Sequence, residues 1–338
     1  MKQTILVTGG TGYIGSHTVV ELINSGYEVI IIDNLSNSNE WINDRIEKIC
    51  GVKPDLHIFD ICNRNALFEF FSKSKKIDAI IHFAAFKAVG ESVQNPIKYY
   101  HNNLVSLMNL IEAMNTFNIK DFVFSSSCTV YGQPDILPVT ETSPIKEATS
   151  PYGNTKQISE RIIRDTIISG NDLTCTLLRY FNPIGAHKSA LIGELPNGIP
   201  SNLIPFITQT ASGKRQMLQV FGNDYNTPDG SCIRDYIDVV DLAKAHVVAV
   251  NRLLSGKQTD KIEVFNLGTG RGLSVLEIIK AFEGSTGVKL PYTIVERRPG
   301  DVEQVWADTS KANKILGWKA QIPIEETLKS AWEWEKTL

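Results

Sequence analysis

Short apolar runs alternate with amphipathic segments through the first half of the chain. The runs TILVT, EVIIID, LHIFD, IDAIIHFAA, KDFVFSSS and LTCTLLRYFN have the composition of β-strands. Between them lie segments with helical spacing, among them GSHTVVELINSG, a long one over residues 93–116, and SPYGNTKQISERIIRDTIISG. Uniformly apolar strands that alternate with helices are typical of a parallel sheet with both faces covered. The pattern predicts an α/β fold with a doubly wound parallel sheet of the Rossmann type.

The pattern becomes irregular after residue 181. The stretch NPIGAHKSALIGELPNGIPSNLIP is rich in proline and glycine, which predicts a loop that packs over another part of the molecule. Later runs such as MLQVFG, IEVFNLG and SVLEIIKAFEGSTG predict a smaller C-terminal α/β domain. We therefore divide the chain into residues 1–181 and 182–338, with roughly 233–268 as a candidate for returning to the first sheet.

The turn between the first strand and the first helix is rich in glycine. In VTGGTGYIGSH, Gly9, Gly12 and Gly15 would permit a tight turn and let a pyrophosphate approach the backbone. The N–H groups that open the helix would bind the anion. Asp33 ends the second strand, where a carboxylate suits the ribose hydroxyls of NAD and repels the extra phosphate of NADP. NAD is the expected cofactor, and a glycine-rich turn without a ligand is the alternative.

Further candidate binding residues lie at the ends of the predicted strands, where a ligand would bind. Ligands of open α/β sheets lie beyond the carboxyl ends of the strands. Asp60 ends the third strand, and Phe83, Ala84 and Lys87 follow the fourth. We expect these residues on the same edge of the sheet as the glycine turn.

A tyrosine and a lysine four residues apart begin the helix after the fifth strand. Ser150 and Pro151 are good starting residues for a helix, so Tyr152 and Lys156 are expected on one face of its first turns. The preceding strand ends in three serines, of which Ser127 is the last. The alternative, an ordinary amphipathic helix start, is weakened by the glycine turn and Asp33 nearby.

The pairing suggests a phenolate base. Lowering the pKa of a tyrosine from about 10 to about 7 requires roughly 4 kcal/mol. A lysine about 6 Å away supplies about 3 kcal/mol at an effective dielectric of about 20, and desolvation opposes that gain. The lysine alone is therefore marginal, and the phenolate is expected only when the positive nicotinamide ring of NAD is also present. The serine would hydrogen-bond the reacting hydroxyl.

Composition and charge exclude several other classes. The net charge is −3 and no long basic run occurs, so nucleic acid is not an expected partner. The first apolar run is too short for a signal peptide or a membrane span, and we expect a cytoplasmic protein without a membrane partner. The five cysteines form no CxxC motif and the six histidines form no HxH or HxxxH pair. Neither structural disulfides nor a metal site is expected.

Several motifs together resemble those of the extended short-chain dehydrogenase/reductase family, and within it the UDP-glucose 4-epimerases. They are VTGGTGYIGSHT, IIDNLSNS, IHFAAFKAVGESVQNP, FSSSCTVYG, SPYGNTK, LRYFNPIGAH, FGNDYNTPDGSCIRDYI, VFNLGTG and RRPGD. The resemblance covers nearly the whole chain. It implies an NAD-binding domain in residues 1–181 and a UDP-sugar-binding domain in residues 182–338.

The resemblance also implies a reaction. Tyr152, assisted by Ser127, would remove the proton of the sugar 4-hydroxyl while hydride passes from C4 to NAD. The 4-keto sugar would turn over in the site and take the hydride back on its other face. Lys156 would lower the pKa of the tyrosine and contact the nicotinamide ribose. UDP contacts remote from C4 would hold the substrate while the sugar rotates.

The resemblance transfers binding roles to individual positions of this chain. The implied cofactor-binding residues are Gly9, Gly12, Tyr13, Ile14, Gly15, Asp33, Asn34, Asp60, Ile61, Phe83, Ala84, Lys87, Asn102, Tyr152, Lys156 and Tyr180. The implied substrate-binding residues are Lys87, Ser127, Tyr152, Asn182, Asn202, Leu203, Phe221, Arg234, Arg298, Asp301 and Val305.

Two positions depart from patterns seen among similar enzymes. Val305 stands where some members carry a tyrosine, which implies room for a 2-acetamido group and activity on UDP-GlcNAc and UDP-GalNAc. A valine chosen for packing is the alternative. Similar dehydratases place an acidic pair where this chain has SSSCTVYG with Cys128, so elimination of water would lack its acid and base.

The remaining alternatives concern the substrate, catalysis and assembly. Another nucleotide-sugar epimerase, acting on UDP-glucuronate or a UDP-pentose, and a non-catalytic dinucleotide-binding sensor remain open. A homodimer is expected through the helices over 93–116 and 152–168, which carry apolar positions beyond the needs of one core face. Those positions are Leu104, Leu107, Met108, Ile111, Ile158, Ile162 and Ile163. Packing of both helices on their own sheet alone is the alternative.

Overall fold

A seven-stranded parallel sheet forms the centre of the larger part of the molecule. The computed structural model describes residues 2–298 and 301–338. The strand order is β10-β6-β5-β4-β1-β2-β3, and all the neighbouring pairs are parallel. The strands are β1 (Thr4–Thr8), β2 (Glu28–Asp33), β3 (Asp55–Ile58), β4 (Ala79–His82), β5 (Asp121–Ser127), β6 (Thr174–Tyr180) and β10 (Ile262–Leu267). The predicted doubly wound parallel sheet is confirmed.

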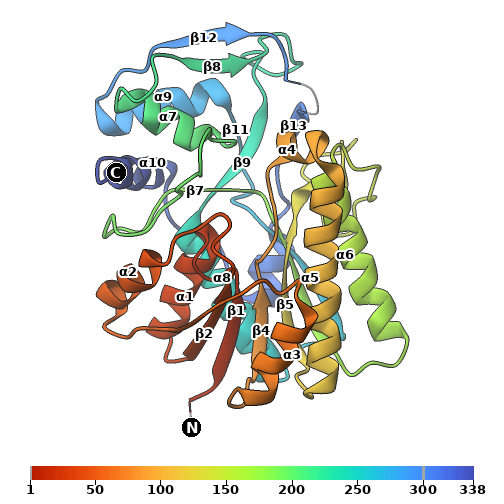
Figure 1. Ribbon diagram of the computed structural model, residues 1–338. Helices are drawn as coiled ribbons and strands as arrows, with labels where there is room; N and C mark the ends of the chain where they lie inside the picture. The colour runs from red at the N-terminus through yellow and green to blue at the C-terminus, as the bar shows by residue number, and fades with distance from the viewer. Residues whose placement is uncertain (1, 299–300) are drawn as a thin grey trace.

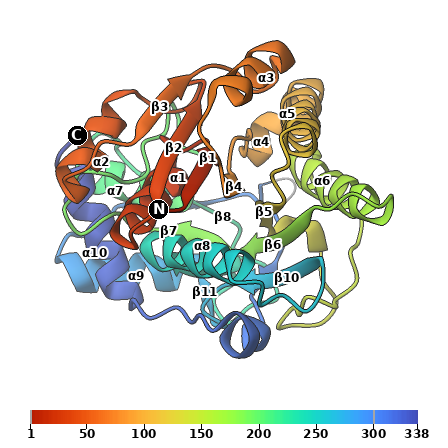
Figure 2. The same ribbon diagram turned by 90° about the horizontal axis from the view of Figure 1, so that it is seen from below.

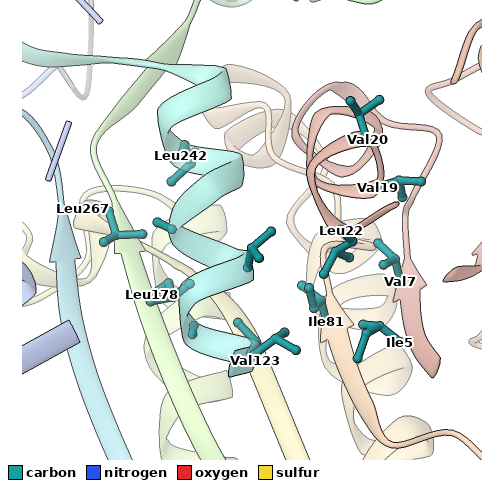
Figure 3. Packing of buried hydrophobic residues seen from close by; sticks show 14 of the residues in the cluster. Ile5, Val7, Val19, Val20, Leu22, Ile81, Val123, Leu178, Leu242 and Leu267 are labelled. Atoms are coloured by element: carbon teal, nitrogen blue, oxygen red, sulfur yellow. The ribbon is translucent and has the colours of Figure 1, made fainter. Parts of the chain in front are cut away.

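Alternate side chains of these strands enter different hydrophobic clusters, and helices cover both faces (Figure 2). Ile5 and Val7 of β1 lie in one cluster, and Leu6 between them lies in the other. The first face is covered by α1 (Tyr13–Asn24), α2 (Trp41–Cys50) and α8 (Val239–Leu254), and Figure 3 shows Leu242 of α8 near Leu178 and Leu267. The second face is covered by α3 (Arg64–Lys73), α5 (Pro96–Thr116) and α6 (Pro151–Ile168).

A smaller α/β unit lies over the carboxyl end of the sheet (Figure 1). Its strand β9 pairs with β7, β11 and β13, and β8 pairs with β12. The strands are β7 (Asn182–Ile184), β8 (Leu218–Phe221), β9 (Ile233–Asp238), β11 (Gly272–Ser274), β12 (Tyr292–Val295) and β13 (Gln304–Val305). The helices are α7 (Leu203–Ala211), α9 (Val275–Thr286) and α10 (Ile324–Glu335). Three short helices complete the described chain: α4 (Val89–Gln94), η1 (Cys128–Tyr131) and η2 (Ala312–Leu316).

The chain passes from the smaller unit back to the central sheet. Within residues 233–268, β9 pairs inside the smaller unit, whereas α8 packs against α1 and β10 pairs with β6. The larger hydrophobic core is therefore built from both halves of the sequence. None of the helices that the structure describes is both long and apolar enough to cross a membrane.

Some predicted elements differ in detail. The helix expected over 93–116 is wrong at its start, because α4 ends at Gln94 and α5 begins at Pro96. Asn95 between them has φ −132° and ψ 59°, in keeping with the exclusion of helical geometry before proline. The helices α2 and α7 were not expected, because neither has a long apolar stripe.

The surplus of apolar residues on α5 and α6 is smaller than expected. Leu107, Ile111 and Ile163 are buried in the cluster that covers the second face of the sheet. These three residues belong to the core of the chain, so their assignment to a dimer surface is wrong. Met108 is 46% exposed. Leu104, Ile158 and Ile162 are half-buried.

Candidate active site

The glycine turn between β1 and α1 forms a cradle that admits no side chains. Gly9 has φ +73°, in the left-handed region that favours glycine. A Cβ on Gly15 would lie 2.1 Å from the Gly9 carbonyl oxygen. Gly12 caps the start of α1 without a side-chain hydrogen bond, so the first N–H groups of the helix face the turn unblocked. The turn can therefore receive an anionic group.

Asp33 at the end of β2 faces this turn. Its carboxylate accepts hydrogen bonds from the Thr11 N–H at 3.1 Å, the Leu35 N–H at 2.9 Å and the Ser38 hydroxyl at 3.1 Å. These bonds fix its position at the edge of the cavity. Only 8% of the residue is exposed.

One cavity brings together all of the residues for which the resemblance implies contact with the cofactor. It runs from the ends of β2 and β3 past the glycine turn to the start of α6. Asp60 lies two residues beyond the end of β3 rather than at its last position, and it accepts a hydrogen bond from the Cys62 N–H at 2.8 Å. The expected residues among its lining are Gly9, Gly12, Tyr13, Ile14, Gly15, Asp33, Asn34, Asp60, Ile61, Phe83, Ala84, Lys87, Asn102, Tyr152, Lys156 and Tyr180.

The helix α6 presents Tyr152 to this cavity. Ser150 caps the helix by accepting a hydrogen bond from the Gly153 N–H at 3.1 Å, and Pro151 is its first residue. Burial raises the pKa of Tyr152 to about 12, and a hydrogen bond with the Ser127 hydroxyl opposes that rise. The phenol of the cofactor-free protein is therefore protonated at neutral pH.

Lys156 lies one helical turn further along α6 and is 5% exposed. Its ammonium donates to the Ser125 carbonyl oxygen at 2.6 Å and lies 4.9 Å from the centre of the Phe124 ring. Burial lowers the pKa of Lys156 to about 8, and the carboxylate of Glu160 opposes the decrease. A buried cation next to the tyrosine can favour its ionised form, but it is itself only moderately basic.

The arginines expected to bind substrate lie in the smaller unit and share one carboxylate. Arg298 contacts Asp301 at 2.8 Å, and Arg234 of β9 lies 3.9 Å from the same carboxylate. The Arg298 guanidinium lies 5.5 Å from the centre of the Phe221 ring at the end of β8. Four residues from β8, β9 and the 298–301 segment therefore form one group, although Pro299 and Gly300 of the RRPGD motif lie outside the described residues.

A second group of expected residues lies where the loop after β7 meets the cofactor cavity. Asn202 precedes α7, whose first residue is Leu203, and its amide donates to Glu194 at 2.6 Å. The same Glu194 oxygen contacts the Lys87 ammonium at 3.0 Å. Asn182 begins β7 and is half-buried. Glu194 thus joins a residue of the cofactor cavity to one of the smaller unit, and nothing in its local sequence marks it as part of the site.

Val305 is 5% exposed and belongs to a hydrophobic cluster that includes Tyr131 and Phe181. It pairs with Arg234 in the β13–β9 register. The residue therefore lies next to the arginine group, although its side chain is packed against apolar neighbours. Cys128, which follows the three serines, is half-buried beside Arg234, and burial raises the pKa of its thiol to about 12.

Two further residues of the site were missed in the sequence. Ser38 orients Asp33, and Glu160 lies below Lys156 on α6. A signal for Glu160 was present, because Tyr152, Lys156 and Glu160 follow one another at intervals of four residues on one face of a helix.

Proteins of known family are similar to this chain in sequence and in structure. A family profile described as GDP-mannose 4,6 dehydratase matches residues 6–331. A UDP-glucose 4-epimerase of Bacillus subtilis (strain 168) is 51% identical over 335 residues, which cover 99% of this chain and 97% of the relative. The crystal structure of a UDP-glucose 4-epimerase from Bifidobacterium longum, in complex with NAD+ and UDP, is 47% identical with a TM-score of 0.95, and covers 99% of this chain and 98% of that chain. The UDP-Glc/GlcNAc 4-epimerase of Campylobacter jejuni is 36% identical with a TM-score of 0.84, and covers 99% of this chain and 100% of that chain.

Proposed function

This chain belongs to the UDP-glucose 4-epimerases of the extended short-chain dehydrogenase/reductase family, and from that premise we propose that it interconverts UDP-glucose and UDP-galactose with a bound NAD. One observation carries the proposal. Tyr152 and Lys156 open into the same cavity as the glycine turn and Asp33, and Ser127 contacts the tyrosine from the adjoining strand end. A base, its cationic neighbour and a dinucleotide cradle therefore meet in one place.

The residues at the cradle suit NAD. The space next to Gly9 and Gly15 admits backbone only, the first N–H groups of α1 are available to a pyrophosphate, and Asp33 is held where ribose hydroxyls can donate to it. When bound there, NAD would supply the hydride acceptor and donor of the reaction.

The protein side chains would handle the proton. Tyr152 would accept the proton of the sugar 4-hydroxyl and later return it to the 4-oxygen, while Ser127 hydrogen-bonds that oxygen. Because burial holds the pKa of the phenol high and that of Lys156 near 8, the lysine charge alone does not ionise the tyrosine at neutral pH. The base is expected to form only with the cofactor bound.

The smaller unit would hold the UDP group. Arg234 and Arg298 carry the fork-shaped donors that suit a diphosphate. Asn202 caps the start of α7 without a side-chain hydrogen bond to the helix, so the first N–H groups of α7, which begins at Leu203, are a further candidate for the nucleotide. Binding energy placed on the nucleotide leaves the sugar free to turn between the two hydride transfers.

The test is a turnover assay without added cofactor. Purified protein mixed with UDP-galactose is expected to form UDP-glucose, detected by chromatography, because NAD remains bound through each cycle. A panel with UDP-glucuronate and UDP-pentoses separates the 4-epimerases of different sugars. Absence of product from every UDP-sugar, with NAD present in the protein, would favour a non-catalytic sensor.

We do not assign elimination of water to this chain, although the matching family profile is described as a dehydratase. Among the residues described, the carboxylates that line the cavity are Asp33, the last residue of β2, and Asp60, which follows β3. In the strand order these two strands lie at the far side of the sheet from β5 and Tyr152. Next to the serines stands the Cys128 thiol, whose pKa is raised to about 12 by burial, and it is a poor acid at neutral pH.

We further propose that the enzyme acts on UDP-GlcNAc and UDP-GalNAc. Val305 is smaller than tyrosine and lies beside Arg234 in the β13–β9 pairing, and the similar C. jejuni enzyme is described as a UDP-Glc/GlcNAc 4-epimerase. Val305→Tyr is expected to lower acetamido-sugar turnover at least about 100-fold and to change UDP-glucose turnover less than about threefold. Val305→Ile, which adds one methylene, should keep both activities. A wild-type enzyme that leaves UDP-GlcNAc unchanged would contradict the proposal.

A homodimer through α5 and α6 is also proposed. These helices pack side by side, and Ile97, Leu104 and Met108 recur at helical spacing on α5 with exposures of 77% for Ile97 and 46% for Met108. Met108→Lys is expected to shift the mass measured by light scattering toward the monomer. The same change at Met217, which precedes β8 in the smaller unit and is 51% exposed, should not. The cytoplasmic location stays a prediction.

A further inference from the structure

The three serines that end β5 each contact a different residue of α6. The Ser125 carbonyl accepts from the Lys156 ammonium at 2.6 Å, and the Ser126 hydroxyl donates to Glu160 at 2.6 Å. Ser127 is the neighbour whose hydroxyl opposes the burial-induced rise in the pKa of Tyr152. Because the three α6 residues follow at intervals of four, the strand end and one helix face match along two turns. Ser125, Tyr152 and Lys156 line the cavity, whereas Ser126 and Glu160 lie behind its lining.

Glu160 is anchored on its other side by a buried arginine. Arg179 of β6 donates to its two carboxylate oxygens at 2.9 and 2.6 Å, and both residues are 2% exposed. The Arg179 guanidinium also donates to the Tyr131 hydroxyl at 3.0 Å, which in turn donates to Asn266 of β10 at 2.6 Å. The carboxylate therefore ties α6 to β5 and β6 through three charge-assisted hydrogen bonds.

We propose that Glu160 is a positioning residue of the reaction: it fixes α6 against the end of β5 and keeps a negative charge one helical turn from the Lys156 ammonium. This inference rests on the proposed epimerase function. A buried ion pair of this kind contributes little net stability compared with apolar residues of the same size. In this proposal the ion pair instead fixes the position of Tyr152 and favours the charged form of Lys156.

The charged and titratable groups around Lys156 support the electrostatic part. On α6 itself it is flanked by Tyr152 and Glu160. From β4 it faces His82, whose pKa is lowered to about 3 by burial and then by the charge of Lys156, so that this imidazole is neutral. From β6 it faces Arg179 beyond Glu160, and from β5 the Phe124 ring. Among these described groups, Glu160 supplies the negative charge that opposes the loss of the lysine proton.

The central test is Glu160→Gln. This change keeps the shape of the side chain and removes its charge, which leaves the Arg179 charge unbalanced near Lys156. The alkaline limb of the kcat–pH profile is expected to move to lower pH by about one unit. The ¹³Cε chemical shift of Lys156, identified by its absence in Lys156→Arg, should show the same displacement in cofactor-free protein, without any turnover.

The matched control is Glu263→Gln. Glu263 of β10 makes the same two-point contact with Arg252, at 2.6 and 2.8 Å, and its side chain is 4% exposed. It lies near the amino end of the sheet, away from the cavity. Loss of its charge is expected to lower the melting temperature and to leave both the pH profile and the Lys156 titration unchanged. Equal shifts in the two variants would overturn the proposal.

Ser126→Ala tests the positioning part separately and covers the case in which Glu160→Gln does not fold. It removes one hydrogen bond from the carboxylate and leaves the ion pair complete. We expect kcat to fall roughly three- to tenfold, with KM for UDP-galactose and the pH limb unchanged. An unchanged kcat here, or an unmoved Lys156 titration in Glu160→Gln, would refute the role of Glu160. Failure of the wild type to convert any UDP-sugar would instead refute the proposed function.

Discussion

The cofactor side and the substrate side of the site are built differently. On the cofactor side, backbone turns and strand ends shape the cavity, and the buried Lys156 ammonium donates to a carbonyl oxygen. On the substrate side, charged side chains are paired with one another, as in the contacts of Asp301 with Arg298 and Arg234. The cofactor cavity therefore has its shape before a ligand binds. On the other side, the arginine charges are paired with a carboxylate that a ligand could replace.

The difference indicates which groups must rearrange in the reaction cycle. A diphosphate entering the smaller unit can replace Asp301 as the partner of Arg298, so binding exchanges one ion pair for another. No equivalent exchange is open to Lys156, because its ammonium is buried away from water. Burial lowers the pKa of this group instead. We therefore expect function to reduce stability mainly on the cofactor side, and we expect the affinity for substrate to depend mainly on the side of Arg234 and Arg298.

The largest expected effect is that of Tyr152→Phe on the cofactor side. Loss of the phenol oxygen should lower kcat by about 1,000-fold or more, since a positioned base contributes roughly 100- to 10,000-fold. The bound NAD, measured by release on denaturation, should stay at the wild-type amount because the glycine turn is untouched. Tyr27→Phe, which removes a hydroxyl at the amino end of β2, is the control. Near-normal turnover of Tyr152→Phe would exclude the phenol from the chemistry.

The next effect concerns the stability of the cofactor-free protein. The pKa of Lys156 is lowered from 10.5 to about 8, so between these values the unfolded chain binds more protons than the folded one. The unfolding free energy of the wild type should therefore rise with pH across this range relative to that of Lys156→Met, by up to about 3 kcal/mol. Urea unfolding at pH 7 and pH 10.5 measures the difference. If the unfolding free energies of the two proteins depended on pH in the same way, burial of Lys156 would not reduce the stability of the folded protein.

The smallest effect is expected from Arg298→Ala on the substrate side. KM for UDP-galactose should rise about tenfold, as for the loss of one charge-assisted hydrogen bond, while kcat stays within a few-fold. Arg297→Ala is the matched control, because Arg297 is adjacent in sequence and pairs with Asp224 at 2.7 Å. If both variants raised KM equally, the effect would come from the charge of the loop rather than from a contact with substrate.

The cofactor side was the more predictable from sequence, because local rules determine it. Apolar runs placed the strands, Gly9 and Gly15 marked the turn, and Ser150 with Pro151 marked the start of α6. The grouping of Arg234 with Asp301 could not be found in this way. It depends on two segments about 70 residues apart meeting in the smaller unit, and no periodicity in the sequence encodes that meeting.

The burial of individual apolar residues also could not be predicted from the hydrophobic pattern. Leu107, Ile111 and Ile163 looked like surplus apolar residues, but the sheet beneath them and the neighbouring helices cover all three. Helical periodicity shows which residues share a face of a helix. It does not show how much of that face is covered by neighbouring elements. The helical spacing placed Glu160 on the face of Tyr152 and Lys156, but its pairing with Arg179 could not be predicted, because that partner comes from the strand β6.

The return of the chain from the smaller unit to the central sheet has a consequence for how the molecule could be divided. A fragment that stops at residue 181 would lack the edge strand β10 and the helix α8. Leu178 and Val123, which Figure 3 shows beside α8, would then face water on the uncovered face of the sheet, and β6 would become an unpaired edge strand. The two halves of this gene are thus not interchangeable modules, and recombination between relatives would need its crossover points on both sides of residues 239–267.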